Sequence, residues 1–226
     1  KLHPSDFVTK PTDRARKEEL KLQVIRQMLL GEKVDTGKLL EVNKMTYAVT
    51  PDRIKFLEQY VAQTEGKSMR IPEALKGWRF IKLQAKEKIP IEPDWSRTAN
   101  YEYDALELLK HIANGGNYGV IGDKDHVIID ADVPEVQAAV EEHLPETLVV
   151  ETPGRAGRHY YFLASLEAAI RLRDLKGKNV GDVQGPGKQV VGPGCVHPDG
   201  GIYRVINPSP CAKVTGEQIR EALSEF

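Results

Sequence analysis

A short apolar run that ends in two acidic residues restricts the possible folds of this chain more than any other segment. Val127-Ile128-Ile129 is β-branched and is followed by Asp130-Ala131-Asp132, which is typical of a buried strand with a polar end. Side chains alternate between the two faces of a strand, so residues two apart share a face. We therefore expect Asp130 and Asp132 to project side by side from the end of a core strand.

Two interpretations of this acidic pair fit its surroundings. Carboxylates at the edge of a core repel each other and are costly to desolvate unless a cation or hydrogen-bond donors neutralise them. Their oxygen atoms suit Mg²⁺ or Mn²⁺ and not zinc. In the other interpretation, Asp132 caps the helix that begins at Val133-Pro134. The pair alone does not distinguish a metal site from a helix cap.

Charge and cysteine content narrow the class of protein. The 226 residues include 32 Lys and Arg against 33 Asp and Glu, a net charge of −1, so a nucleic-acid-binding surface would have to be a local patch. The two cysteines, Cys195 and Cys211, form no CxxC pair, which favours a reduced, cytoplasmic setting. No apolar run approaches the length of a membrane span and the N-terminus lacks a signal-peptide pattern, so we expect no membrane partner.

The spacing of apolar residues divides the chain into two regions. Residues 1–75 carry apolar positions at helical spacing, which predicts a helical N-terminal region, and we assign no chemistry to it. Residues 76–226 alternate strands and helices, which predicts an α+β domain with a mixed sheet and not a doubly wound parallel sheet. Thr215 and Gln218 fit a capping box. Strands are expected over 78–83, 117–121, 126–131, 147–151, 159–163, 180–183, 189–191 and 203–206, and helices over 103–113, 134–143 and 215–226.

A glycine-rich basic segment, residues 152–159, separates two of the expected strands. Its glycines allow backbone N–H groups to approach an anion, and Arg155 and Arg158 add charge-assisted donors. His159 begins the next strand and is able to hydrogen bond a phosphate oxygen. A solvated turn is the simpler explanation of such a segment. It is not the phosphate-binding loop of NTPases, which needs Gly-Lys-Ser/Thr before a helix.

A third carboxylate, Asp182, lies within another short strand, Val180-Gly181-Asp182-Val183. If this strand neighbours the one that carries Asp130, the three carboxylates form an acidic triad. Such a triad can hold two metal ions about 3.5–4 Å apart, which activate an attacking oxygen and stabilise a leaving one.

The order of these parts resembles the primase-polymerase (Prim-Pol) domain of the archaeo-eukaryotic primase superfamily, found in replication proteins of archaeal plasmids, viruses and bacterial mobile elements. The resemblance covers roughly residues 77–206. Asp130-Ala131-Asp132 matches the first motif of the family, Gly157-Arg158-His159 the second, and Asp182 the third. Similar flanking segments are Gly77-Trp78, Lys88-x-Pro90, Trp95, residues 117–120, residues 185–193 and residues 197–203.

This resemblance implies an RRM-like catalytic core and template-directed nucleotidyl transfer by a DNA primase/polymerase, in the replication of a plasmid or mobile element. It implies that Asp130, Asp132 and Asp182 are the catalytic residues and hold Mg²⁺ or Mn²⁺. It also implies that His159 contacts the incoming nucleoside triphosphate.

Further partners are expected on two grounds. On electrostatic grounds we add Arg155, Arg158 and Lys188 as nucleotide-binding residues. The resemblance implies single-stranded or primed DNA and nucleoside triphosphates as substrates, with a helicase domain beyond Phe226 or a helicase subunit as a partner.

Two alternatives remain open from the residues alone. Clustered carboxylates also serve metal-dependent nucleases, although the glycine-rich Arg/His segment fits a triphosphate better. A non-catalytic RRM-like module would stack bases on exposed aromatic residues, and Tyr160 and Phe162 share a face of their strand, although core packing explains them at least as well. Three carboxylates around one site would repel a nucleic acid backbone, which favours the enzyme.

Overall fold

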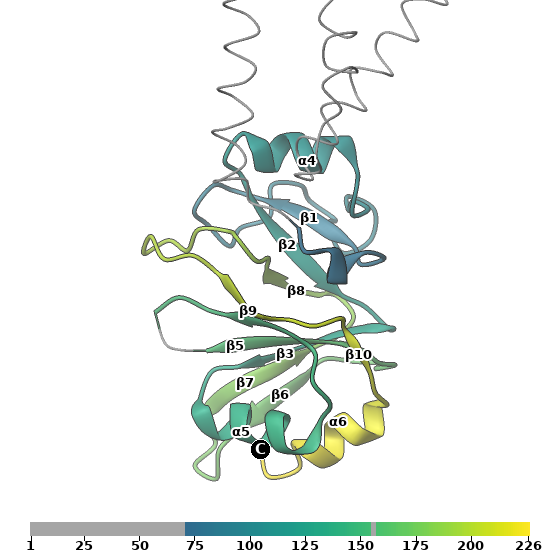
Figure 1. Ribbon diagram of the computed structural model, residues 1–226, viewed down its shortest axis with the longest axis vertical. Helices are drawn as coiled ribbons and strands as arrows, with labels where there is room; N and C mark the ends of the chain where they lie inside the picture. The colour runs from purple at the N-terminus through teal and green to yellow at the C-terminus, as the bar shows by residue number, and fades with distance from the viewer. Residues whose placement is uncertain (1–70, 155–156) are drawn as a thin grey trace, which may run out of the picture. The chain divides into compact units, whose positions relative to one another are not determined.

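The computed structural model describes residues 71–154 and 157–226 (Figure 1). These residues belong to one unit of the chain, Met69–Phe226. They combine three α-helices with two sheets, so the predicted α+β class is confirmed for this part of the chain. The predicted N-terminal helical region, residues 1–75, lies outside the described residues except for its last five positions, and Arg155 also lies outside them.

Most of the predicted elements are present with bounds close to those expected. The helices are η2, a 3₁₀ turn (Glu73–Leu75), α4 (Leu106–Ala113), α5 (Pro134–His143) and α6 (Gly216–Ala222). The strands are β1 (Phe80–Leu83), β2 (Asn117–Gly122), β3 (His126–Ala131), β4 (Leu148–Glu151), β5 (Arg158–Leu163), β6 (Ile170–Arg173), β7 (Asn179–Gln184), β8 (Lys188–Val191), β9 (Arg204–Pro208) and β10 (Ala212–Lys213). β3 and α5 have the predicted bounds, whereas β6 and β10 were not predicted.

The strands divide between a small and a large sheet (Figure 1). The small sheet has the order β1-β2-β8, and the large sheet has the order β6-β7-β3-β5-β4-β9, with antiparallel pairing throughout both paths. β10 adds a parallel pair with β5, which makes the large sheet mixed, as predicted. β2 and β3 belong to different sheets although only three residues separate them. In that connection the Asp123 carboxylate accepts the backbone N–H groups of Asp125 and His126 at 2.8 and 2.9 Å.

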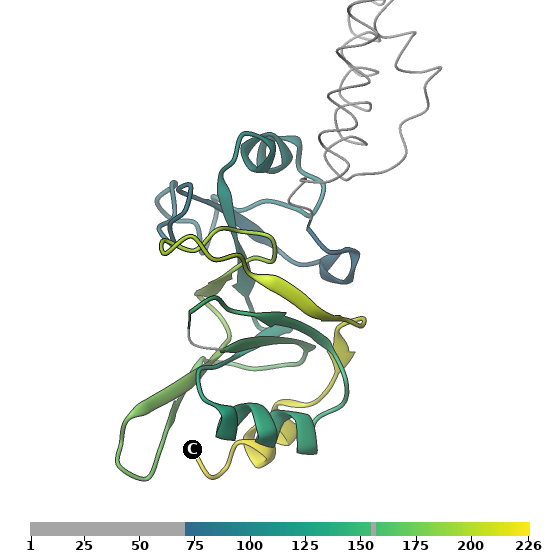
Figure 2. The ribbon, with the colours of Figure 1, turned by 60° about the vertical axis from the view of Figure 1, so that its left-hand side comes forward.

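The two faces of the large sheet have different surroundings. α5 and α6 cover one face (Figures 1 and 2), where Tyr160 and Phe162 of β5 join Ile129 of β3 in the main core. Burial of each large apolar side chain stabilises the fold by roughly 1.5–3 kcal/mol. The residues between them face the other way: the Tyr161 ring lies 5.5 Å from that of Trp78, which precedes β1. This second face therefore looks toward the small sheet.

The helix termini bear on two of the predictions. Thr215 Oγ1 accepts the N–H of Gln218 at 3.1 Å and Gln218 Oε1 accepts the N–H of Thr215 at 2.8 Å, so the predicted capping box of α6 is confirmed. The N-cap residue of α5 is Val133, and its side chain makes no cap hydrogen bond. Asp132 therefore does not occupy the N-cap position of α5, and the interpretation of this residue as the N-cap was wrong.

Candidate active site

Three of the predicted site residues lie in register on neighbouring strands of the large sheet. Asp130 of β3 pairs with His159 of β5 on one side and with Asp182 of β7 on the other. Residues directly opposite each other in antiparallel strands point to the same face, with Cβ atoms about 4.5–5.5 Å apart. We call Asp182, Asp130 and His159 the central row. Their neighbours Ile129 and Tyr160 are in the core under the helices, so the central row lies on the other face.

Each carboxylate of the central row has a basic side chain beside it. His159 Nε2 lies 3.4 Å from Asp130 Oδ1, and Arg171 Nε of β6 lies 3.5 Å from Asp182 Oδ1. Burial acts to raise the pKa of the Asp130 carboxyl, but the charge and contact of His159, together with the charge of Lys88, bring this pKa below its ordinary value. Like charges directly opposite each other destabilise a sheet, and these basic side chains offset the repulsion between the two carboxylates.

Aromatic rings hold His159 in place. The His159 side chain is buried, its ring is stacked on that of Tyr203 with centroids 5.8 Å apart, and it forms a T-shaped contact with the Tyr161 ring with centroids 6.4 Å apart. Tyr203 also contacts His197, whose Nδ1 lies 3.3 Å from Asp199 Oδ2. His159 Nδ1 is buried and has no hydrogen-bond partner among the described residues. The ring is therefore oriented by packing on one side and by Asp130 on the other.

Two glycines bring backbone close to the acidic residues. A Cβ atom on Gly181 would lie 2.4 Å from the carbonyl oxygen of Asp130, and one on Gly157 would lie 2.7 Å from Thr152 Oγ1 and 3.8 Å from Asp132 Cα. Asp132 itself is exposed and follows β3, and its N–H donates to the Val180 carbonyl at 3.2 Å. The end of the glycine-rich segment therefore lies beside Asp132, at the end of the central strand.

The other predicted nucleotide-binding residues lie elsewhere. Arg158 forms an ion pair with Glu141 of α5, because Arg158 alternates with His159 along β5 and so faces the helices. Lys188 is exposed at the start of β8, opposite Gly122 in the small sheet. Arg155 is outside the described residues. The structure thus brings Asp130, Asp182 and His159 together, and it does not place Arg158 or Lys188 in the central row.

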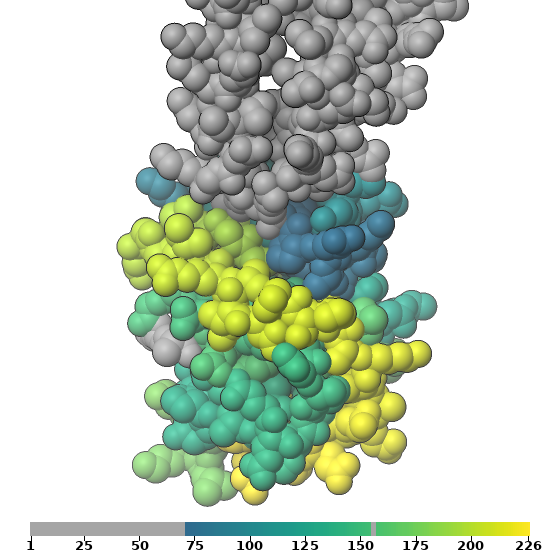
Figure 3. Space-filling view, in the orientation of Figure 1, coloured from purple at the N-terminus to yellow at the C-terminus, as the bar shows by residue number. Residues whose placement is uncertain are grey.

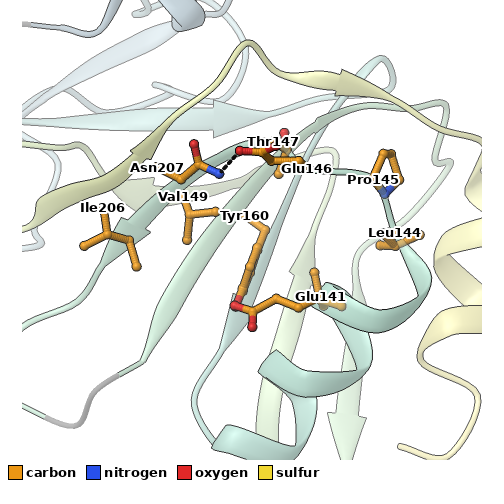
Figure 4. A pocket seen from close by; sticks show the side chains of 10 residues that line it. Glu141, Leu144, Pro145, Glu146, Thr147, Val149, Tyr160, Ile206 and Asn207 are labelled. Carbon is orange, nitrogen blue, oxygen red and sulfur yellow. Dashed lines mark hydrogen bonds between the residues drawn. The ribbon is translucent and has the colours of Figure 1, made fainter.

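A pocket of about 250 Å³ lies on the helix-covered face, between α5 and strands β4 and β9 (Figure 4). Figure 4 shows the Tyr160 ring reaching toward Glu141, and the Tyr160 hydroxyl donates to Glu141 Oε1 at 2.7 Å. Asn207 Nδ2 donates to Glu146 Oε1 at 2.9 Å across another part of the pocket. Because Tyr160 alternates with His159 along β5, this pocket and the central row lie on opposite faces of the sheet.

Three residues near the central row were not assigned to the site from the sequence. Tyr203 and Lys88 were noted only within flanking segments, and Arg171 lies in a strand that was not predicted. The alternation Ile-Arg-Leu-Arg over residues 170–173 is a period-two signal that would have indicated this strand. The contacts of Tyr203 and Lys88 depend on how distant segments pack, and the sequence carries no comparable signal for them.

The donor atoms of the site fit a hard divalent cation. Asp130 and Asp182 face each other across two strands, and carboxylate oxygens suit Mg²⁺ and Mn²⁺. Within residues 71–154 and 157–226, no group of three or more His, Cys, Asp or Glu side chains is arranged so that it could hold a metal ion. A pair of carboxylates is nevertheless enough for Mg²⁺, which usually keeps waters and takes further oxygen ligands from substrate phosphates.

The fold and the central row define a class of protein. Opposed carboxylates beside a histidine, on the face of the large sheet away from the helices, suit metal-dependent transfer of a phosphorus-containing group. The family model described as "Bifunctional DNA primase/polymerase, N-terminal" matches residues 72–222. The chain therefore belongs to the Prim-Pol family, and this membership indicates nucleotidyl transfer of the DNA primase/polymerase type, with DNA and nucleotides as substrates.

A search of the curated proteins found no match. In the part of the chain that the structure describes, no helix has the length and apolar character needed to cross a membrane.

Proposed function

We propose that this chain is a template-directed DNA primase/polymerase that uses Mg²⁺ or Mn²⁺ and acts in the replication of a plasmid or mobile element. The observation that carries the proposal is the central row, in which two carboxylates and a histidine share one face of three adjacent strands. The match to the Prim-Pol family over residues 72–222 supports the same activity.

In the proposed reaction, the 3′-hydroxyl of a primer, or of a first nucleotide, attacks the α-phosphorus of a nucleoside triphosphate. An O–P bond forms, the bond to pyrophosphate breaks, and the hydroxyl loses its proton. Divalent cations, when bound, would neutralise the triphosphate and activate the attacking hydroxyl. Asp130, Asp132 and Asp182 would hold them. Such a transfer depends on positioning and charge, which a rigid sheet supplies, more than on covalent catalysis.

His159 would orient the triphosphate. Its packing against Tyr203 and its contact with Asp130 restrict the ring, so a hydrogen bond to a phosphate oxygen would cost little side-chain entropy. Lys88 is exposed and its charge acts on Asp130, so it is a further candidate for a phosphate contact.

The basic residues proposed from the sequence differ in their readiness for this role. We keep Arg155 and Lys188 as proposed phosphate contacts. Arg158 would first have to leave Glu141, with which it is paired.

A nucleotide-incorporation assay tests the proposal. The full chain is incubated with single-stranded DNA, labelled nucleotides and Mg²⁺ or Mn²⁺, with and without an annealed primer. The double variant Asp130→Asn/Asp132→Asn removes two charges while keeping side-chain size. The matched control, Glu142→Gln/Glu217→Gln, removes two exposed charges from α5 and α6 on the other face of the sheet.

We expect metal-dependent product from the wild type and the control and none from the aspartate variant, and product without primer would identify primase activity. Shortening of the labelled DNA in place of extension would indicate a nuclease. No product in any lane, with DNA binding that persists in chelator, would leave a non-catalytic binding module and refute the proposal.

A further inference from the structure

The hairpin formed by β6 and β7 carries a concentration of positive charge, of which the proposed active site uses Arg171 alone. It comprises residues 170–184 and projects from the large sheet (Figure 2). We call its outer part, residues 170–179, the basic hairpin. Its second arm continues into Asp182 of the central row, so the basic hairpin and the active site share a strand.

Four cationic side chains line the basic hairpin: Arg171, Arg173, Lys176 and Lys178, all exposed. The acidic residue among them is Asp174, and its carboxylate is committed to the turn, because Oδ1 accepts the N–H groups of Lys176 and Lys178 at 2.9 and 2.8 Å. The local charge is therefore strongly positive, in a chain whose net charge is −1.

The turn of the basic hairpin is internally ordered. The N–H of Asp174 donates to the Lys178 carbonyl at 2.9 Å, the N–H of Gly177 donates to the Asp174 carbonyl at 2.8 Å, and Arg173 Nη1 donates to the Gly177 carbonyl at 2.6 Å. Gly177 has a φ of +77°, a conformation that favours glycine. Leu175 at the tip has a relative exposure of 101%. The hairpin thus holds cations and one apolar side chain out into solvent without needing to fold on a partner.

The line of cations on the basic hairpin begins beside the carboxylates of the central row. Arg171 is the cross-strand partner of Asp182 and its Nε lies 3.5 Å from the carboxylate. β7 pairs with β3 through Gly181 and Ala131, so the residues before Gly181 extend past the end of β3 at which Asp132 lies. A polyanion that occupied the active site would meet the basic hairpin as it left the site on this side.

We propose that the basic hairpin binds the sugar-phosphate backbone of the DNA on which the enzyme acts. This inference rests on the proposed function. The chemistry that selects DNA is the line of exposed cations beside a site for phosphoryl chemistry, since phosphate contacts supply most of the affinity of proteins for nucleic acid. An exposed apolar tip is compatible with packing on a sugar or base. A chain without net positive charge needs such a local patch to hold its template.

Fluorescence anisotropy with labelled DNA tests this proposal in the full chain. The variant Lys176→Gln/Lys178→Gln is compared with Lys124→Gln/Lys213→Gln, which removes two exposed lysines from the opposite end of the sheet, near the start of β3 and the end of β5. Binding to single-stranded and to primed DNA is measured in chelator over a range of salt concentrations, so catalysis is not required. Melting temperatures verify that all variants are folded.

We expect the hairpin variant to bind DNA more weakly and the control to bind like the wild type. Loss of two phosphate contacts makes the negative slope of log K against log salt less steep by about 1.4 for single strands, which corresponds to about fivefold weaker binding per lysine near 0.1 M salt. The KM for the nucleotide in primer extension should not change, because in this proposal the two lysines contact the DNA and not the triphosphate.

The outcomes separate this proposal from the proposed function. If both lysine variants bind DNA equally, or if the hairpin variant raises only the KM for the nucleotide, the basic hairpin does not bind DNA and the proposal is wrong. If the wild type binds DNA and the hairpin variant binds it weakly, but no lane shows extension, the proposed function fails while the DNA-binding hairpin stands. If the wild type binds neither single-stranded nor primed DNA but still extends a primer, the basic hairpin proposal is wrong while the proposed function stands.

Discussion

We expect the variant Gly181→Ala to disable the active site by separating the two strands that carry its carboxylates. Gly181 pairs with Ala131 of β3 and directly precedes Asp182. A Cβ atom at this position would lie 2.4 Å from the Asp130 carbonyl oxygen, whereas real Cβ atoms essentially never come within 3.0 Å of another atom. The obstacle is backbone and cannot rotate away, so β7 and β3 would have to move apart between Asp130 and Asp182.

The structure gives the size of this effect. The contact must lengthen from 2.4 Å to at least 3.0 Å, and a misplacement of about 1 Å at an active site can cost about 10²-fold in rate. We therefore expect kcat for nucleotide incorporation to fall about 10- to 100-fold. Overpacking of this kind costs about 1–3 kcal/mol of stability. At about 2–4 °C per kcal/mol for a chain of this size, Tm should fall by about 2–12 °C.

The assay is steady-state primer extension well below the Tm of both variants, so that unfolding does not lower the rate. Gly185→Ala is the matched control, because its Cβ would lie 3.3 Å from Leu166 Cδ2, the end of a side chain that can shift. We expect this control to retain kcat and Tm within about twofold and a few degrees. If Gly181→Ala kept the wild-type kcat and Tm, the close approach of β7 to β3 would not set the geometry of the site, and the reasoning would be refuted.

Three further variants test separate contacts. Asp182→Asn should lower incorporation at least about 10²-fold while Tm in chelator stays equal or rises, because a like-charge pair with Asp130 is removed; a lower Tm would contradict this. Tyr203→Leu removes the ring stacked on His159, an aromatic contact worth about 0.5–1.5 kcal/mol, so the KM for the nucleotide should rise about 2- to 10-fold. Tyr203→Phe should not change this KM, and equal KM values in both variants would exclude the stacking role. Thr215→Ala should lower Tm by about 2–4 °C through loss of the helix cap without a change in kcat, and a lower kcat would show that α6 affects the other face of the sheet.

Local signals were enough to predict the elements that carry the core. β3 and α5 have the predicted bounds because an apolar β-branched run and a Pro-led amphipathic segment are strong local patterns. β6 was not predicted, although the alternation of apolar and charged residues over 170–173 is a period-two signal for a strand. The assignment of β2 and β3 to different sheets was not predictable, since a connection of three residues is more typical of a hairpin.

The residue types of the active site could likewise be predicted from local sequence patterns, whereas its geometry depends on contacts between distant segments. The types of the acidic residues and of His159 indicate the chemistry, whereas their register across β7, β3 and β5 depends on strand pairing that no local pattern reveals. The orientation of Arg158 was predictable: it adjoins His159 in the same strand, so the two side chains must face opposite sides. The role of Tyr203 was not predictable from the sequence, because its contact with His159 joins segments more than forty residues apart.

The electrostatics of the central row link the two proposals. Asp130 and Asp182 each lie beside a basic side chain, His159 for one and Arg171 for the other. If a divalent cation neutralised the carboxylates, His159 and Arg171 would no longer be needed to offset the negative charge of Asp130 and Asp182. Both side chains would then be available to bind phosphate groups. In the proposed reaction His159 would then contact the triphosphate, while Arg171 would extend the line of cations on the basic hairpin. The carboxylate pair would thus couple metal binding to the affinity for both substrates, so DNA should bind more tightly in Ca²⁺ than in chelator, and this difference should be smaller in Asp182→Asn.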